Sequence, residues 1–518
     1  MRVRLFLGAA AGVAAVTVAS RAVGFGRTAV LARALGTSCV GDTYQAANAI
    51  PNVVFDVVAG GALASLVVPV LAGAAAAGDR ETVSRIASAL LTWTVAVLTP
   101  VALLGIGVAP QLMRALVGVA PRCGRPMLDV GSRMLIVFLP QVVLYGVGIV
   151  LAGILQAHRR FLGPALAPLL SSLVVITAYF LYDASGPVPL SRLTRGQELL
   201  LSVGTTLGVA VLSLGLLVPV RRCGLRLRPE WRFPPGVAAR MRALAAAGFV
   251  GLAAQQLALV VGLRLAAHGR EGSVVVFQVA TALFLLPGAV LAVPIATTVF
   301  PSLTAHAMAG EQGEYARVAG RSLGAVLLTM LGGTAVLVAV AGPVAQVLAS
   351  GVPGVSSVGQ LARATELFAP GLLGYGLLAL LGRSLYARGD GRTPAAATVV
   401  GWLVVASSDV TLVAATGLDR VVALALGNTI GMTVAGALLL AALRRAAPGA
   451  LQGLGRTAAA GLLGLTLALG AAAVLPTWRG SAAACLAAAG LAAVVVGSVY
   501  LAAVRLVDPD GLRALRHV

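Results

Sequence analysis

The sequence contains no lysine, and only 17 of its 518 residues are aspartate or glutamate. Charged residues make up 11% of the chain and aromatic residues 5%, whereas 59% of the residues are hydrophobic. Soluble domains carry about 25% charged residues, so this composition excludes that class and indicates a membrane protein. A chain without lysine also lacks the phosphate-binding G-x-x-x-x-G-K-[ST] loop, which argues against ATP hydrolysis. The net charge of +21 comes from dispersed arginines and does not suggest a nucleic-acid partner.

Cysteine and histidine are also scarce, with four of each. No two cysteines form a C-x-x-C pair and the histidines lack metal-ligand spacing, so the sequence predicts neither a metal site nor an enzyme. The histidines in predicted loops or tails are His158, His268, His306 and His517. Cys39 and Cys123 are both expected on the outer side and could form a bridge, but free thiols are the favoured interpretation.

The hydrophobic residues form fourteen segments, each long enough to cross the ~30 Å hydrocarbon core as a helix. We therefore predict an all-α polytopic membrane protein with fourteen transmembrane helices. Because helical sequence continues past residue 20, the first segment is expected to be an uncleaved helix rather than a signal peptide. The predicted limits are 5–35, 43–76, 83–110, 133–157, 164–183, 198–220, 240–267, 273–305, 320–348, 362–387, 394–415, 420–443, 457–475 and 481–506.

The arginines predict the orientation, because cytoplasmic loops of membrane proteins are enriched in basic residues. Most of them fall on the inner side if both termini are cytoplasmic. The densest cluster, in residues 221–242, is interpreted as a topology anchor and linker rather than as a site for anionic headgroups. One predicted outer loop is an exception to this enrichment, and the sequence does not explain it. This loop holds Arg114, Arg122, Arg125 and Arg133.

An internal repeat divides the chain. Residues 67–79 align with 299–311 at an offset of 232, and residues 155–164 align with 385–394 at an offset of 230. A duplicated six-helix unit gives two lobes related by a pseudo-two-fold axis along the membrane normal. The predicted divisions are an N-lobe (1–220), a basic cytoplasmic linker (221–239), a C-lobe (240–445), and two additional helices with a cytoplasmic tail (446–518).

Prolines occur at corresponding places of the second and eighth predicted helices. They are Pro51, Pro69, Pro287 and Pro301. Because proline removes a backbone hydrogen bond and clashes with the preceding turn, these residues are expected to interrupt both helices. Pro51 and Pro287 are the predicted hinges of a conformational change between the lobes.

Residues 20–72, SRAVGFGRTAVLARALGTSCVGDTYQAANAIPNVVFDVVAGGALASLVVPVLA, contain the pattern S-R-x-x-G-F-x-R, then an aspartate, then I-P-N, then G-A with V-P-V-L. This pattern resembles the N-terminal signature of the MurJ/MviN family of lipid II flippases, which belongs to the MOP exporter superfamily. Further similarity lies in GILQAHRRFLGPALAPLL (153–170), LPGAVLAVPIATTVFPSL (286–303) and LYARGDGRTP (385–394). The resemblance implies fourteen helices, with two lobes and two additional helices.

The resemblance also implies roles for residues of the first two helices. Arg21 and Arg27 fall on positions that line a cationic cavity for the pyrophosphate and sugar of lipid II. Guanidinium groups match phosphate oxygens bidentately. The alternative is that they snorkel to an interface or pair with Asp42 or Asp56. Because six residues turn a straight helix through about 600°, a bend is expected between the arginines.

The remaining predictions for this site concern the same two helices. Gly24 and Gly26 are the predicted hinge that lets both arginines face one cavity. Asp42 and Asn52, on the family's aspartate and proline-asparagine positions, complete the predicted substrate-binding set.

Several family positions are altered. Where the family carries an arginine after the proline-asparagine pair, this chain has Phe55 and Asp56, and Gly60 replaces an acidic residue. A further family arginine aligns with Ala282. Because half of the expected cationic set is missing, another polyprenyl-linked precursor is an alternative substrate.

Asp409 is a second carboxylate inside a predicted span, and such residues are functional candidates by default. With Ser408 and Asn428, and with Ser407 nearby, it is a candidate site for a coupling Na⁺ or proton; a structural hydrogen-bonding role is the alternative. A membrane potential could replace such an ion. No other cofactor is predicted.

The resemblance implies a transporter that flips lipid II across the bacterial cytoplasmic membrane by alternating access, for peptidoglycan synthesis, cell-wall biogenesis and cell shape. Its expected partners are lipid II, membrane lipids and other cell-wall synthesis proteins. Three alternatives remain: an exporter of another lipid-linked glycan, a MATE-like antiporter, and a transport-inactive membrane scaffold.

Overall fold

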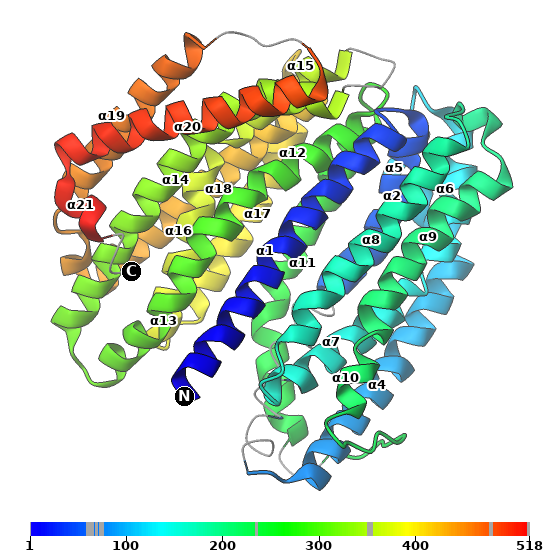
Figure 1. Cartoon of the computed structure of the whole chain (residues 1–518), viewed down its shortest axis with the longest axis horizontal. Coiled ribbons are helices and arrows are strands. Elements are labelled where there is room, and N and C mark those ends of the chain that lie inside the picture. The colour runs from blue at the N-terminus through cyan, green and yellow to red at the C-terminus, as the bar shows by residue number, and fades with distance from the viewer. Residues whose placement is uncertain are drawn as a thin grey trace. The chain divides into compact units, whose positions relative to one another are not determined.

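The fold was analysed in a computed structural model that describes residues 2–57, 67, 71, 77–233, 237–349, 356–475 and 480–514. Every regular element in these residues is a helix (Figure 1). The chain forms two compact units, with the division inside α11. Unit 1 comprises Met1–Gln256 and Arg270–Gly272, and unit 2 comprises Leu257–Gly269 and Ser273–Val518.

Unit 1 is a bundle in which α1 packs along α8, and α8 packs along α9. Side-chain caps begin several of its helices: Ser38 accepts from the Gly41 amide, and Thr194 forms a capping box with Gln197. Its helices are α1 (Arg2–Ala34), α2 (Cys39–Phe55), α4 (Arg80–Gly107), α5 (Ala109–Val117), α6 (Gly124–Phe138), α7 (Gln141–Ala157), α8 (Leu162–Ala184), η2 (Leu190–Arg192), α9 (Arg195–Leu214), α10 (Leu217–Arg221) and, as far as Gln256, the first part of α11 (Val237–Ala267).

Unit 2 is built mainly on α14, the longest described helix, which packs against α16, α19 and α20. Its elements are α12 (Ser273–Pro287), the π-helical turn η3 (Gly288–Ala292), α13 (Val293–Met308), α14 (Gln312–Ala349), α15 (Ser356–Phe368), α16 (Gly371–Ala387), α17 (Arg392–Ala415), α18 (Arg420–Ala446), η4 (Pro448–Leu451), α19 (Leu454–Ala473), α20 (Ala482–Val507) and α21 (Pro509–Ala514).

Within the described residues, eleven helical stretches are long and apolar enough to cross a membrane. A twelfth is the pair α15 and α16, bent by 45° at a short break. The prediction of a polytopic all-α membrane protein is therefore confirmed. The helix predicted to begin at residue 133 begins earlier in the structure. α6 starts at Gly124, so Arg125 and Arg133 lie on a helix rather than in the predicted outer loop.

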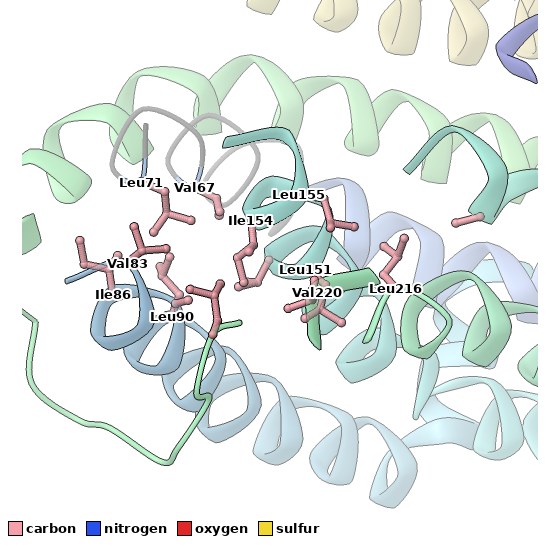
Figure 2. Close-up of a cluster of buried hydrophobic side chains, with 14 residues drawn as sticks. Val67, Leu71, Val83, Ile86, Leu90, Leu151, Ile154, Leu155, Leu216 and Val220 are labelled. Carbon is pink, nitrogen blue, oxygen red and sulfur yellow. The ribbon is translucent and has the colours of Figure 1, made fainter. Parts of the chain in front are cut away.

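The core of unit 1 around α4, α7 and α10 is apolar (Figure 2). Val83, Ile86 and Leu90 of α4 meet Leu151 and Ile154 of α7 in this cluster.

The N-terminus of α4 is capped by Asp79, whose Oδ1 accepts from the Thr82 amide at 3.0 Å. The hydrogen bonds from Thr82 hold the pKa of the Asp79 carboxyl below its usual range.

Two loops have closely similar backbone geometry in the two units. After α7, the Arg160 amide bonds back to the Leu155 carbonyl at 2.8 Å, and Arg159 has a φ of 58°. After α16, the Asp390 amide makes the same bond at 3.1 Å, and Gly389 has a φ of 82°. Both are helix C-caps with a left-handed residue, and they fall on the segments that align in the sequence.

The prolines have different effects on the helices. Pro51 stays inside α2, which continues into π-helical residues 56 and 57, and Pro287 directly precedes the π-helical turn η3. The prediction that Pro51 and Pro301 interrupt their helices is wrong, because Pro51 lies within α2 and Pro301 lies within α13. A single missing backbone bond is tolerated in a membrane helix with packed neighbours. Pro69 lies outside the described residues.

An ion pair accounts for one arginine of the predicted outer loop. Arg133 on α6 contacts Glu198 on α9, with Nη2 to Oε2 at 2.7 Å and Nε to both carboxylate oxygens at 3.1 Å. The Glu198 side chain is only 3% exposed. Arg133 therefore neutralises a buried carboxylate and joins two helices of unit 1.

The two C-terminal helices belong to unit 2. Tyr500 of α20 donates a hydrogen bond to the Leu328 carbonyl of α14 at 2.7 Å. Gly461 and Gly464 of α19 lie so close to Leu331 and Tyr500 that an added methyl group would clash or be tightly packed. Close packing of small residues is typical of helix contacts in membranes.

Candidate functional site

The arginines of α1 have different surroundings in unit 1. α1 is a continuous helix from Arg2 to Ala34 and passes through Gly24 and Gly26 without a break. Arg21 is exposed, whereas Arg27 is half-buried. Neither arginine forms an ion pair with a described residue, so the alternative in which they pair with Asp42 or Asp56 is not observed in this structure.

Three tyrosine hydroxyls lie within electrostatic range of the Arg27 guanidinium. They belong to Tyr44, Tyr145 and Tyr179. The Tyr44 hydroxyl bonds to the Tyr179 hydroxyl at 2.8 Å and to Thr205 Oγ1 at 2.7 Å. Tyr44, Tyr145, Tyr179 and Thr205, on α2, α7, α8 and α9, are called the polar cluster below.

Asn52 of α2 is the predicted site residue that joins this cluster. Its Oδ1 accepts from the Tyr145 hydroxyl at 3.1 Å, and its Nδ2 donates to the Asn48 carbonyl at 2.9 Å. Phe55, one turn further, packs on the Tyr145 ring with centroids 4.4 Å apart. Buried Asn48 Oδ1 has no hydrogen-bond partner in the described structure.

Asp56, at a position where the resemblance implies an arginine, contacts an amide rather than a cation. Its Oδ2 accepts from Gln256 Nε2 on α11 at 3.2 Å. The Gln256 Oε1 atom is buried without a partner among the described residues. Gly60, the other altered position of this region, lies outside the described residues. Asp56 therefore makes this end of the cluster less cationic than the family pattern implies.

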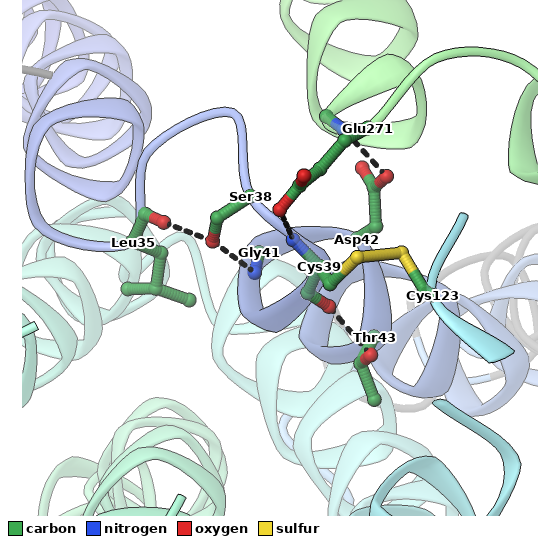
Figure 3. The surroundings of a disulfide bond; sticks show 9 residues. Leu35, Ser38, Cys39, Gly41, Asp42, Thr43, Cys123 and Glu271 are labelled. Atoms are coloured by element: carbon green, nitrogen blue, oxygen red, sulfur yellow. Dashed lines mark hydrogen bonds between the residues drawn. A yellow bond between two sulfur atoms is a disulfide. The ribbon is translucent and has the colours of Figure 1, made fainter. Parts of the chain in front are cut away.

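Asp42 lies at the other end of α2. It is 3% exposed, and its Oδ2 accepts from the Gly272 amide at 2.8 Å (Figure 3). The adjacent Glu271 accepts from the Cys39 amide at 3.0 Å. Ten residues separate Asp42 from Asn52, about 15 Å of helix, so the structure does not bring these two predicted ligands together.

Cys39 and Cys123 form a disulfide between α2 and the start of α6 (Figure 3). The Cα atoms are 5.5 Å apart. The interpretation that both are free thiols is therefore wrong: 84 residues separate them, and only the packing of α2 against α6 brings them together. Cys223 and Cys485 are free.

Unit 2 holds the second candidate site. Asp409 on α17 is 2% exposed and Asn428 on α18 is 8% exposed. Asp409 Oδ1 and Asn428 Nδ2 are both buried without a hydrogen-bond partner in the described residues. Asp409 packs so closely on Gly427 that an added methyl group there would overlap its carboxylate. Ser408 is half-buried, and Ser407 bonds to the backbone of its own helix.

The sequence model of the family described as "Lipid II flippase MurJ" matches residues 31–483. The chain belongs to the MurJ family. Among curated members, a probable lipid II flippase MurJ of Rhizobium tropici is 26% identical over 74% of this chain and 71% of its own length. A lipid II flippase MurJ of Burkholderia cenocepacia is 27% identical over 73% and 72%.

Solved structures show the same fold. A lipid II flippase MurJ in an inward closed conformation superposes with a TM-score of 0.75, covering 97% of this chain and 99% of that chain at 17% identity. An inward-facing multidrug resistance MATE transporter of the MOP superfamily gives 0.69, covering 84% and 96% at 15% identity. Family membership agrees with the prediction of a transporter rather than an enzyme.

Sequence reasoning missed most of the polar cluster. Tyr44, Tyr145, Tyr179 and Thr205 come from four helices, and no spacing within one segment relates them. Their signal was compositional: the chain has only 8 tyrosines, and the hydroxyls of three of them lie within electrostatic range of Arg27.

Proposed function

We propose that this member of the MurJ family moves lipid II from the inner to the outer face of the cytoplasmic membrane for peptidoglycan synthesis. The observation that carries the proposal is the family match over residues 31–483. Lipid II and the surrounding membrane lipids are then its partners. Contacts with other cell-wall synthesis proteins are a further part of the proposal.

Arg27 is the proposed centre of headgroup binding, with Arg21 on the same helix. A pyrophosphate in a low-dielectric site needs charge-assisted donors, and guanidinium supplies two parallel ones. The absence of an ion pair at Arg27 within the described residues, together with the surrounding hydroxyls, supports this role. Asn52 contributes an amide to the same cluster, and Asp42 stays a predicted ligand.

Alternating access of two lobes is the proposed mechanism. It assumes fourteen transmembrane helices with an N-lobe (1–220), a linker (221–239), a C-lobe (240–445) and two additional helices (446–518). The repeated C-caps at Arg159 and Gly389 support the duplication. The π-helical residues after Pro51 and Pro287 are places where helices can bend, while the hinge role of Gly24 and Gly26 stays a prediction.

Transport without ATP hydrolysis needs another energy source, and we propose that Asp409 serves in coupling to Na⁺, to protons or to the membrane potential. An unpartnered buried carboxylate oxygen supports either a protonated carboxyl or a cation ligand. Ser408 could supply a second oxygen. The unpartnered atom of Asn428 is a donor as assigned, so it suits a hydrogen bond to the carboxyl better than a cation.

A reconstituted flipping assay tests the function. Purified protein in vesicles should expose fluorescent lipid II on the opposite leaflet faster than protein-free vesicles do. Undecaprenyl-linked saccharides without the peptide would be run in parallel, because Phe55 and Asp56 stand where family arginines are expected. Faster movement of these saccharides than of lipid II would assign another lipid-linked glycan, and no movement of either would support the scaffold alternative.

A further inference from the structure

Residues 225–233 of the basic linker, called the linker strap below, form no helix or strand and are hydrogen-bonded along α4 of unit 1. The Ser84 hydroxyl donates to the Arg226 carbonyl. The Arg228 amide donates to a second hydroxyl at 3.1 Å and the Glu230 amide donates to a third at 3.0 Å. These two acceptors on α4 are Ser88 and Thr92. The strap is therefore bound to the helix through its backbone.

The spacing of these contacts follows from regular geometry. The three hydroxyls recur every fourth residue, which is about 6 Å along a helix axis. Their partners recur every second residue of the strap, which is about 6.8 Å along an extended chain. Because the two repeats nearly coincide, a short extended segment can follow the helix and keep its hydrogen bonds.

Extended geometry also sends alternate side chains to opposite sides. Leu225 is buried, and Leu227 and Phe233 pack against the apolar core in which α4 and α7 meet (Figure 2). Arg226 and Arg228, which alternate with these leucines, are exposed. From Leu225 to Arg228, side chains packed on the core therefore alternate with exposed arginines.

Two tryptophans, Trp93 of α4 and Trp231 of the strap, pack against each other. The Trp93 and Trp231 rings are perpendicular with centroids 5.5 Å apart, and Trp93 Nε1 donates to the Trp231 carbonyl at 3.0 Å. Both stay exposed, at 44% and 57%. Tryptophan concentrates at the membrane interface. α4 carries no charged residue after Arg85, which lies about 12 Å from Trp93 along the axis, so the tryptophan pair lies near the start of the uncharged part of the helix.

The exposed cations of this region have no ion-pair partner in the described part of the chain. They are Arg221, Arg222, Arg226, Arg228 and Arg232. Nearby acidic residues are fewer, namely Asp79, Glu81 and Glu230, and the Glu230 carboxylate already accepts from the Arg232 amide at 3.0 Å. A fixed surplus of positive charge therefore borders the tryptophan pair.

We propose that the linker strap is a binding site for the headgroups of anionic phospholipids, with its arginines on the phosphates and Trp93 and Trp231 at headgroup depth. Phospholipid fits better than a soluble acidic protein, because the apolar face of α4 beside the strap, with Val97, Val101 and Leu104 exposed, needs acyl chains. This proposal is independent of which lipid-linked precursor the chain transports.

Lipid titration of the purified full-length protein tests the proposal. Native mass spectrometry would give apparent affinities for phosphatidylglycerol and for phosphatidylcholine. The variant R226Q/R228Q/R232Q should bind phosphatidylglycerol about tenfold or more weakly, with phosphatidylcholine unchanged. The matched control R114Q/R122Q/R125Q removes the same charge from exposed positions elsewhere and should retain its affinity. Equal loss in both variants, or no loss in the strap variant, would overturn the proposal.

A second variant, S88A/T92V, keeps every charge but removes two hydroxyl acceptors. It should release the strap, weaken phosphatidylglycerol binding and speed tryptic cleavage after Arg226. If cleavage accelerates while the lipid affinity is unchanged, the ordered strap is not the binding site. A polyprenyl pyrophosphate added in competition separates the two phosphate sources: displacement of phosphatidylglycerol at equal concentration would assign the arginines to the transported precursor instead.

Discussion

Arg27 is half-buried and within electrostatic range of three tyrosine hydroxyls, and it is without an ion pair to any described residue. Replacing it with alanine therefore leaves no buried carboxylate unpaired, a situation that costs several kcal/mol in other proteins. We expect Arg27→Ala, and likewise Arg21→Ala, to abolish flipping while membrane abundance stays nearly unchanged. Precursor accumulation in a depletion strain and immunoblotting of membranes measure the two quantities.

The matched control on the same helix is Arg33→Ala, because Arg33 is exposed and outside the predicted ligand set. It should keep both activity and abundance. Lysine at position 27 should restore only part of the activity, since it retains the charge but loses the planar fork of donors. Collapse of abundance in Arg27→Ala would assign the arginine to packing rather than to headgroup binding.

Arg159 has a left-handed backbone, and at the equivalent C-cap of α16 the residue is Gly389. A side chain in this conformation costs about 1 kcal/mol or more relative to glycine. Arg159→Gly should therefore raise the unfolding temperature in detergent by a few degrees. Arg160→Gly, at an exposed neighbour without positive φ, should lower it or leave it unchanged, and a drop in both variants would contradict the strain at Arg159.

At the scale of single elements, the start of α2 is held by contacts distant in sequence: the Cys39–Cys123 disulfide and the bonds to Glu271 and Gly272. The disulfide closes a loop of 84 residues, so its removal should cost at most about 4.6 kcal/mol. Thermal unfolding with and without a dithiol reductant measures this effect. Cys39→Ser/Cys123→Ser should abolish the response to reductant, whereas Cys223→Ser should preserve it.

The helices themselves could be predicted from the sequence, but the contacts between them could not. Long apolar runs produce helices such as α4 and α14 wherever backbone groups must bond internally. The bond between Tyr44 and Tyr179, and the ion pair between Arg133 and Glu198, depend on which helices become neighbours. Pro301 shows the complementary limit: local propensity predicts a break, and the surrounding helices preserve α13.

At the scale of the whole molecule, the repeated loops at Arg159 and Gly389 and the family membership point to the same plan of two similar halves. The same offset of 230 residues relates Pro140, before α7, to Pro370, before α16, and each begins a helix with the same backbone pattern. This agreement could be anticipated from two short sequence matches. The division inside α11 could not, because it depends on contacts along one continuous helix.

The orientation of the whole chain in the membrane can be tested by labelling its cysteines from one side. The arginine distribution predicts Cys39 and Cys123 outside and Cys223 inside, and disulfides persist in oxidising compartments. In a Cys123→Ser variant, a membrane-impermeant maleimide should label Cys39 in intact cells. Cys223, which is only partly buried, should react only after the cells are permeabilised. Labelling of Cys223 in intact cells, with Cys39 protected, would reverse the predicted topology and place both termini outside.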